Sequence, residues 1–108
     1  MERNVTLGHG LWGSQPDTVY NVRLRTTATD DNGNPSLSSA PGTLTTAPTH
    51  VAYTREAAGT ARLYIDGVEQ SEAVVAGDFS NWNAAYPFGL GNELTGDRPW
   101  LGQFDLVA

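Results

Sequence analysis

Glycine and proline interrupt this sequence so often that no 11-residue window shows helical periodicity. The chain has 12 glycines and 6 prolines in 108 residues, and short segments rich in Val, Thr, Tyr, Leu and Ile lie between them. Apolar and polar side chains alternate in these segments, as they do in strands that bury one face. The sequence therefore predicts a single all-β domain with one small core.

The clearest predicted strand spans residues 18–27. Tyr20 and Val22 fall on one face of this segment, and Arg23 and Arg25 fall on the other. This alternation predicts a half-buried strand whose outer face carries the two arginines.

A turn is expected after that strand, because residues 30–35 read Asp-Asp-Asn-Gly-Asn-Pro. The same residues superficially suggest a calcium-binding EF-hand loop. Pro35 and Pro41 stand where that motif needs Gly and Glu, so the EF-hand interpretation fails. Residues 36–41 are expected to form an exposed loop.

A meander of antiparallel strands is predicted in the middle of the chain. Residues 50–55 and 61–66 read as a hairpin joined by residues 56–60. In the second strand, alternation places Ala61, Leu63 and Ile65 on one face. Asp66-Gly67 is a typical type I′ turn sequence and leads into a third strand from residue 68.

The last eight residues, 101–108, are almost wholly apolar. A central strand that is buried on both faces has this pattern, so such a strand is predicted here.

Composition excludes several classes of function. The formal net charge is −6 and all six basic residues are Arg, so the chain offers no basic face to a nucleic acid and no lysine for Schiff-base chemistry. There is no Cys, which removes disulfides, thiolate nucleophiles and Cys-ligated zinc. The first residues lack the apolar run of a signal peptide, and no stretch approaches a membrane span of roughly 18 apolar residues.

Five segments taken in order resemble a known family. They are residues 49–55 (THVAYTR), 58–67 (AGTARLYIDG), 77–83 (GDFSNWN), 90–93 (LGNE) and 97–108 (DRPWLGQFDLVA). Together they resemble the bacterial branch of the laminin-G-like, concanavalin A-like lectin/glucanase superfamily.

This resemblance implies an all-β fold, an antiparallel β-sandwich of the jelly-roll type. It implies non-catalytic binding of carbohydrate or of another extracellular protein, outside the cell or at its surface. Relatives are usually longer at both ends, so we expect the sandwich to be incomplete and to self-associate, or to have rearranged termini. A self-associating structural domain without a small ligand is therefore the alternative function.

Three tryptophans are candidate platforms for sugar rings, because an aromatic face suits the apolar face of a pyranose. Trp100 stands next to an apolar segment and is expected to pack in the core. Trp82 lies between Asn81 and Asn83 in a polar loop, and Trp12 has glycine and serine neighbours.

An oxygen-rich set of side chains is spread over loops that the family brings towards one another. It comprises Asp78, Asn81, Asn83, Asn92, Glu93 and Asp97. Calcium prefers such oxygen ligands, so no cofactor is expected except a possible calcium ion here. The alternative is that these residues only form loops.

The third hypothesis is that the domain is a glycoside hydrolase, and the sequence does not favour it. Glycoside hydrolysis needs two carboxyl groups about 5 to 10 Å apart across a cleft. The carboxylates of Glu69 and Glu72 flank a turn, and Asp105 stands alone. His9 and His50 have no serine nucleophile in a recognisable motif.

The sequence thus predicts a non-enzymatic binding module that partners a glycan or an extracellular protein and forms homo-oligomers. Its candidate ligand-binding residues are Asn81, Trp82, Asn83, Asn92, Glu93 and Asp97, with Arg23 and Arg25 as a second set. The two arginines carry forked donors that suit a carboxylate or an acidic sugar. The alternative for them is a pair of solvated arginines with acidic partners across the sheet.

Overall fold

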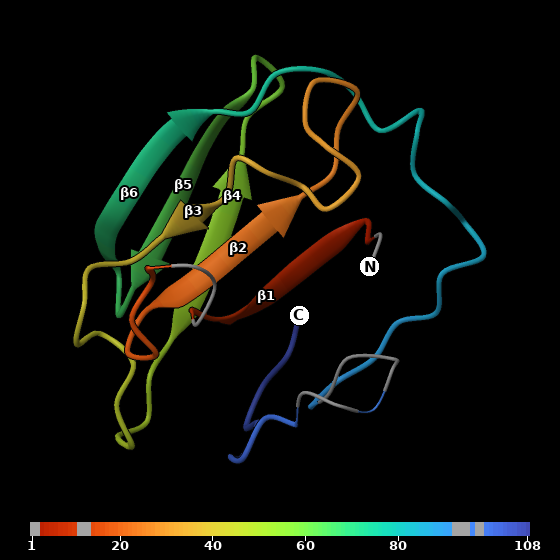
Figure 1. Cartoon of the computed structure of the whole chain (residues 1–108). Coiled ribbons are helices and arrows are strands. Elements are labelled where there is room, and N and C mark those ends of the chain that lie inside the picture. Colours follow the sequence, from red (N-terminus) through yellow and green to blue (C-terminus); the bar gives the residue numbers. More distant parts are fainter. Residues whose placement is uncertain (1–2, 11–13, 92–95, 97–98) are drawn as a thin grey trace.

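The computed structural model of the chain describes residues 3–10, 14–91, 96 and 99–108. That part of the chain contains six strands and no helix, and the strands form two antiparallel three-stranded sheets (Figure 1). Sheet A has the order β1 (Val5–His9), β2 (Tyr20–Leu24) and β3 (Leu37–Ser38), and sheet B has the order β4 (Val51–Arg55), β5 (Thr60–Ile65) and β6 (Val68–Val74). The predicted antiparallel β-sandwich is therefore confirmed.

The core lies between the two sheets and consists of two adjoining clusters. One cluster is Tyr20, Val22, Leu63 and Ile65, and the other is Leu24, Leu37, Ala61 and Val75. The core side chains of β2 and β5 come from alternate positions, because successive side chains of a strand point to opposite faces. Sheet B thus buries Ala61, Leu63 and Ile65 on one face, as the sequence pattern predicts.

The outer face of sheet A differs from the prediction. Arg23 and Asn21 were expected on a solvated face, but they are 7% and 6% exposed. Asn21 Nδ2 donates to the hydroxyls of Ser36 and Ser38, and Arg23 Nε donates to Asn21 Oδ1. The prediction was wrong because the polar side chains beside β2 gather over it and exclude water from both residues.

The hairpins of sheet B agree with the sequence. Strands β4 and β5 pair antiparallel as the predicted hairpin, with Val51 opposite Ile65. Asp66 and Gly67 both have positive φ, at 51° and 79°, as a type I′ turn requires. The following strand β6 is longer than predicted, and its register shifts once, beside Leu63 and Tyr64.

Two segments do not adopt the predicted conformation. Residues 36–41 were expected to be an exposed loop, but Leu37 and Ser38 form β3, and Leu37 is buried against the core. Residues 101–108 were expected to be a buried central strand, but they form no strand and Leu101 is 95% exposed. An apolar segment becomes a central strand only when strands flank it on both sides, and none in the described chain does so.

The chain after β6 leaves the sandwich and returns to it. Residues 75–91 form a long arc beyond sheet A, and the last residues run below β1 (Figure 1). Trp100, on this returning segment, packs against the first core cluster and anchors it. No helix in the described part of the chain is long and apolar enough to cross a membrane.

Candidate functional site

Loop 77–83, which carries the first predicted site residues, ties the two sheets together at one end of the sandwich. Thr26, just beyond β2, is fully buried, and its hydroxyl donates to the Ala76 carbonyl at 2.7 Å. In return, Asn81 Nδ2 donates to the Thr26 carbonyl at 3.0 Å. These bonds give Asn81 a structural role at the end of β2.

Trp82 is also fastened to sheet A. Its indole N–H donates to the Arg25 carbonyl at 2.6 Å, and its ring lies 4.8 Å from that of Phe79, centroid to centroid. The guanidinium of Arg55 lies over the Phe79 ring, 5.2 Å from its centroid. Because Trp82 remains 39% exposed, part of its ring surface is open to solvent.

Asn83 forms a reciprocal pair with Asn4. The Asn83 backbone N–H donates to Asn4 Oδ1 at 3.0 Å, and Asn4 Nδ2 donates to the Asn83 carbonyl at 2.9 Å. The side chain of Asn83 accepts from the Ala85 N–H. Asn81, Trp82 and Asn83 therefore come together in one loop and fix it, and their role in ligand binding stays a prediction.

The other residues of that predicted set, Asn92, Glu93 and Asp97, lie outside the described residues, as does Trp12. The structure therefore does not say whether they join loop 77–83.

The carboxylates that the sequence singled out for calcium or turns make local hydrogen bonds. The pKa of the Asp78 carboxyl is lowered by bonds from the Ser80 hydroxyl and backbone N–H. The pKa of Asp30 is lowered chiefly by a bond from the Asn34 N–H. Among the described residues, no three or more His, Cys, Asp or Glu side chains are grouped so that they could hold a metal ion.

The second predicted set consists of Arg23, in β2, and Arg25, just beyond it, and the two arginines have different environments. Arg23 is buried, whereas Arg25 forms an ion pair with Asp31 at 3.3 Å. Arg25 thus has an acidic partner, but its side chain is only 12% exposed and Asp31 lies in the turn after β2 rather than across the sheet. The burial of Arg23 places it away from a ligand that approaches from solvent.

Glu69 and Glu72, considered for hydrolysis, meet at one arginine on the outer face of sheet B. Arg62 Nε lies 2.9 Å from Glu72 Oε2 and 3.9 Å from Glu69 Oε2. Arg62 Nη1 lies 2.5 Å from Glu56 Oε1. The hydrogen bonds that Arg62 donates to Glu56 and Glu72 raise the pKa of its guanidinium. The three carboxylates surround a cation on an open strand surface.

A depression of about 290 Å³ opens at the other end of sheet A. Its described lining comes from three parts of the chain: the end of β1, the loops that flank β2 and β3, and the returning segment. The lining residues are His9, Asp17, Leu44, Pro99, Trp100 and Leu101. It therefore combines an indole and apolar side chains with one imidazole and one carboxylate.

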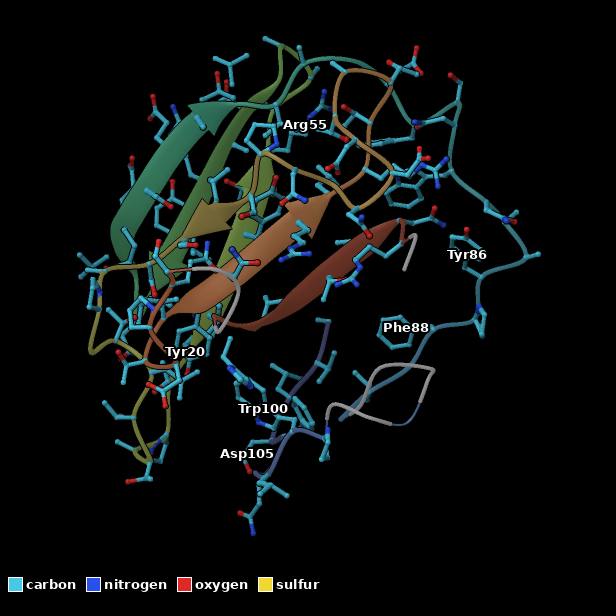
Figure 2. The ribbon with its side chains drawn as sticks, viewed as in Figure 1. Tyr20, Arg55, Tyr86, Phe88, Trp100 and Asp105 are labelled. Atoms are coloured by element: carbon cyan, nitrogen blue, oxygen red, sulfur yellow. The ribbon has the colours of Figure 1, made fainter. Side chains whose placement is uncertain are left out.

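The position of Trp100 in this depression is fixed by neighbouring rings. Tyr20 stacks on it at 6.3 Å between ring centroids, and His9 lies tilted at 5.9 Å. Phe104 lies at 6.4 Å, and the Trp100 backbone N–H donates to the Gly91 carbonyl. Figure 2 shows Trp100 on the returning segment beside Tyr20. The expected core packing of Trp100 is confirmed in part, because the indole also borders the depression.

Sequence analysis did not find this depression. Pairing of β1 with β2 places His9 opposite Tyr20, and both of these rings contact Trp100. Nothing in the sequence brings Asp17, Leu44 and Trp100 to the same place, because their contact depends on the path of the segment after residue 91.

A second groove, of about 370 Å³, runs between the edge strands β1 and β4. It is lined by Leu7, Thr49, His50, Val51, Ala52, Tyr53, Leu106 and Ala108. Partial burial raises the pKa of the Tyr53 hydroxyl. The groove is the open side of the sandwich, where the core-facing side chains of the two sheets are incompletely covered.

Comparison with known proteins agrees with this architecture. The family model for a laminin G-type domain, described as the concanavalin A-like lectin/glucanases superfamily, matches residues 6–108. No curated protein and no solved structure matched the chain. The six-stranded sandwich and the match over nearly the whole sequence show that the chain belongs to the concanavalin A-like lectin/glucanases superfamily.

Proposed function

We propose that this domain is a non-catalytic carbohydrate-binding module whose ligand site is the Trp100 depression. The observation that carries the proposal is the meeting of Trp100, His9 and Asp17 around one depression. An indole offers an apolar surface to a sugar ring, and a carboxylate and an imidazole beside it can bond to the ring hydroxyls. Ligand pockets in proteins begin at roughly 300 Å³. The depression, at about 290 Å³, is close to this lower limit and suits one or two sugar units.

The described lining favours binding over hydrolysis. Glycoside hydrolysis takes two carboxyl groups across the scissile bond, whereas Asp17 is the one carboxylate among the described lining residues. The family is typical of proteins outside the cell, and we place the domain there, where glycans are the expected partners. An extracellular protein is the other partner that the family implies.

The experiment is a glycan array followed by calorimetric titration of the best ligand, with and without calcium. His9→Ala and Asp17→Asn each remove a polar partner, so the affinity is expected to fall about tenfold for each. His50→Ala and Asp105→Asn are matched controls outside the depression and are expected to bind as the unmodified chain does. Unchanged thermal unfolding must accompany each loss.

Full affinity in both site variants would contradict the proposed site. If Trp82→Ala abolished binding instead, with the fold intact, the site would lie at loop 77–83, as the sequence predicted.

Self-association with a second copy is a second candidate function, favoured by the edge strand β1. The Asn4 carbonyl accepts from the Arg25 N–H and the Gly10 N–H donates to the Val19 carbonyl, at the two ends of the β1–β2 ladder. The alternation of an antiparallel ladder therefore points the backbone groups of Val5, Leu7 and His9 outward. Val5 and Leu7 are about half exposed, and β1 carries no carboxylate that would repel a second β1. An uncharged, unpaired edge of this kind pairs readily with another chain.

Light scattering over a concentration series tests this second candidate. A dimer that Leu7→Lys converts to a monomer supports pairing through β1, because a charge at an edge opposes it. Leu90→Lys, at another exposed leucine, is the control. A monomeric mass of the unmodified chain at every concentration would exclude self-association.

A further inference from the structure

The described lining of the Trp100 depression holds two ionisable side chains. Among its described lining residues Asp17 carries a carboxylate and His9 an imidazole, and none is Lys or Arg. No lining cation in the described part of the chain is therefore available to bind an acidic sugar. The Asp17 carboxylate offers a protonated amine an ion pair, and the Trp100 indole offers it a cation–π contact.

Two further properties of the chain favour a cationic sugar as the ligand. Leu44, Pro99 and Leu101 add apolar surface to the lining, against which the carbon skeleton of a sugar can pack. The formal net charge of −6 also gives the whole molecule a negative field, which attracts cationic ligands and repels anionic ones.

We propose that the Trp100 depression selects glycans with a free amino group, such as glucosamine units, over N-acetylated sugars, and rejects uronic acids. This inference rests on the proposed function and names its ligand class. Asp17 supplies the counter-charge for the amine, Trp100 supplies the aromatic surface, and His9 bonds to a neighbouring hydroxyl.

Calorimetric titration of the full chain with three tetrasaccharides tests the proposal. The probes are oligomers of glucosamine, N-acetylglucosamine and galacturonic acid, each at low and high NaCl. The glucosamine oligomer is expected to bind about tenfold more tightly than the acetylated one, and its affinity is expected to fall as salt rises. The galacturonate oligomer is expected not to bind.

Two variants of equal charge separate a specific site from general attraction to an acidic protein. Asp17→Asn and Asp105→Asn each remove one negative charge, but only Asp17 lines the depression. Asp17→Asn is expected to weaken glucosamine binding about tenfold and to remove the preference over the acetylated oligomer, while Asp105→Asn leaves both unchanged. Equal weakening in the two variants would mean nonspecific attraction and would overturn the inference.

The outcomes for the two proposals are distinct. Binding of acetylated or other neutral glycans at the depression, without preference for the amine or dependence on salt, overturns the selectivity and leaves the proposed function standing. Failure of every glycan on the array and of all three oligomers to bind the folded chain overturns both.

Discussion

At the scale of single residues, Thr26 shows how a polar side chain joins the two sheets. It is fully buried, its hydroxyl donates to the Ala76 carbonyl, and the same oxygen accepts from the Ala28 N–H. Its backbone carbonyl accepts from Asn81. Thr26, just beyond β2, thus bonds to both Ala76 and Asn81 and helps to hold the start of the arc.

Replacing Thr26 with Val keeps the shape of this side chain and removes its hydroxyl. We expect the free energy of unfolding to fall by about 1–2 kcal/mol, because two backbone groups lose their partner. Urea denaturation measures the change, and Thr46→Val, at an exposed threonine, is the control and should have little effect. Equal stability of the two variants would show that the hydroxyl does not contribute.

The sequence predicted the core-facing residues well and the polar residues poorly. Alternation alone identified Tyr20, Val22, Leu63 and Ile65, because burial of one strand face follows a period of two. It could not predict the burial of Arg23, which depends on the polar groups assembled around it by folding. A polar side chain in a strand is exposed only where no neighbouring group provides its hydrogen bonds in the folded chain.

At the scale of elements, the turns carry much of the information in this chain. Gly33 and Gly67 have nearly the same positive φ, 78° and 79°, but different surroundings. A Cβ at Gly33 would lie 2.7 Å from the Leu24 backbone nitrogen, whereas a Cβ at Gly67 would meet nothing within 4 Å.

These two glycines form a matched pair for substitution. Gly67→Ala is expected to cost only the backbone strain of the left-handed region, about 1–2 kcal/mol. Gly33→Ala adds a steric clash with the backbone of β2 and is expected to cost clearly more. Urea denaturation of both variants tests this, and equal losses would mean that the loop of residues 30–35 moves away from β2 without cost.

The loop of residues 30–35 also gives stability a dependence on pH. The pKa of Asp30 is lowered in the folded chain below its ordinary value of 3.8, so its contribution is full above that value and is lost as pH falls through the folded pKa. Asp78 acts in the same direction.

Asp30→Ala tests this contribution. The variant is expected to be less stable than the unmodified chain at neutral pH, and the difference should shrink below about pH 3.8. Urea midpoints measured between about pH 7 and about pH 2 show the trend. A difference that stays constant over this range would contradict it.

The sequence predicted some elements better than others for a physical reason. The hairpins of β4, β5 and β6 depend on local turn chemistry at Asp66-Gly67, so they were predictable. β3 and the segment 101–108 depend on which distant strands lie beside them. Residues 36–41 were therefore expected to be an exposed loop although Leu37 is buried, and residues 101–108 were expected to be a buried strand although they are exposed, so both predictions were wrong.

At the scale of the whole molecule, the two candidate sites lie at different places and depend on different segments. Loop 77–83 sits on the arc and is hydrogen-bonded to the far end of β2. The Trp100 depression forms where the returning segment meets Tyr20 and the end of β1. The sequence pointed to the first site because it groups Asn and Trp locally, and only the fold reveals the second.

The most direct test of the central claim is nuclear magnetic resonance mapping of the binding site with a glucosamine tetrasaccharide. Each tryptophan gives its own indole N–H signal, so the position of the ligand can be followed residue by residue. Binding at the depression predicts shifts of the Trp100 indole and of the backbone signals of His9, Asp17 and Leu101, with Trp82 unchanged. Shifts confined to Trp82 and loop 77–83 would contradict the account and place the ligand at the opposite end of β2.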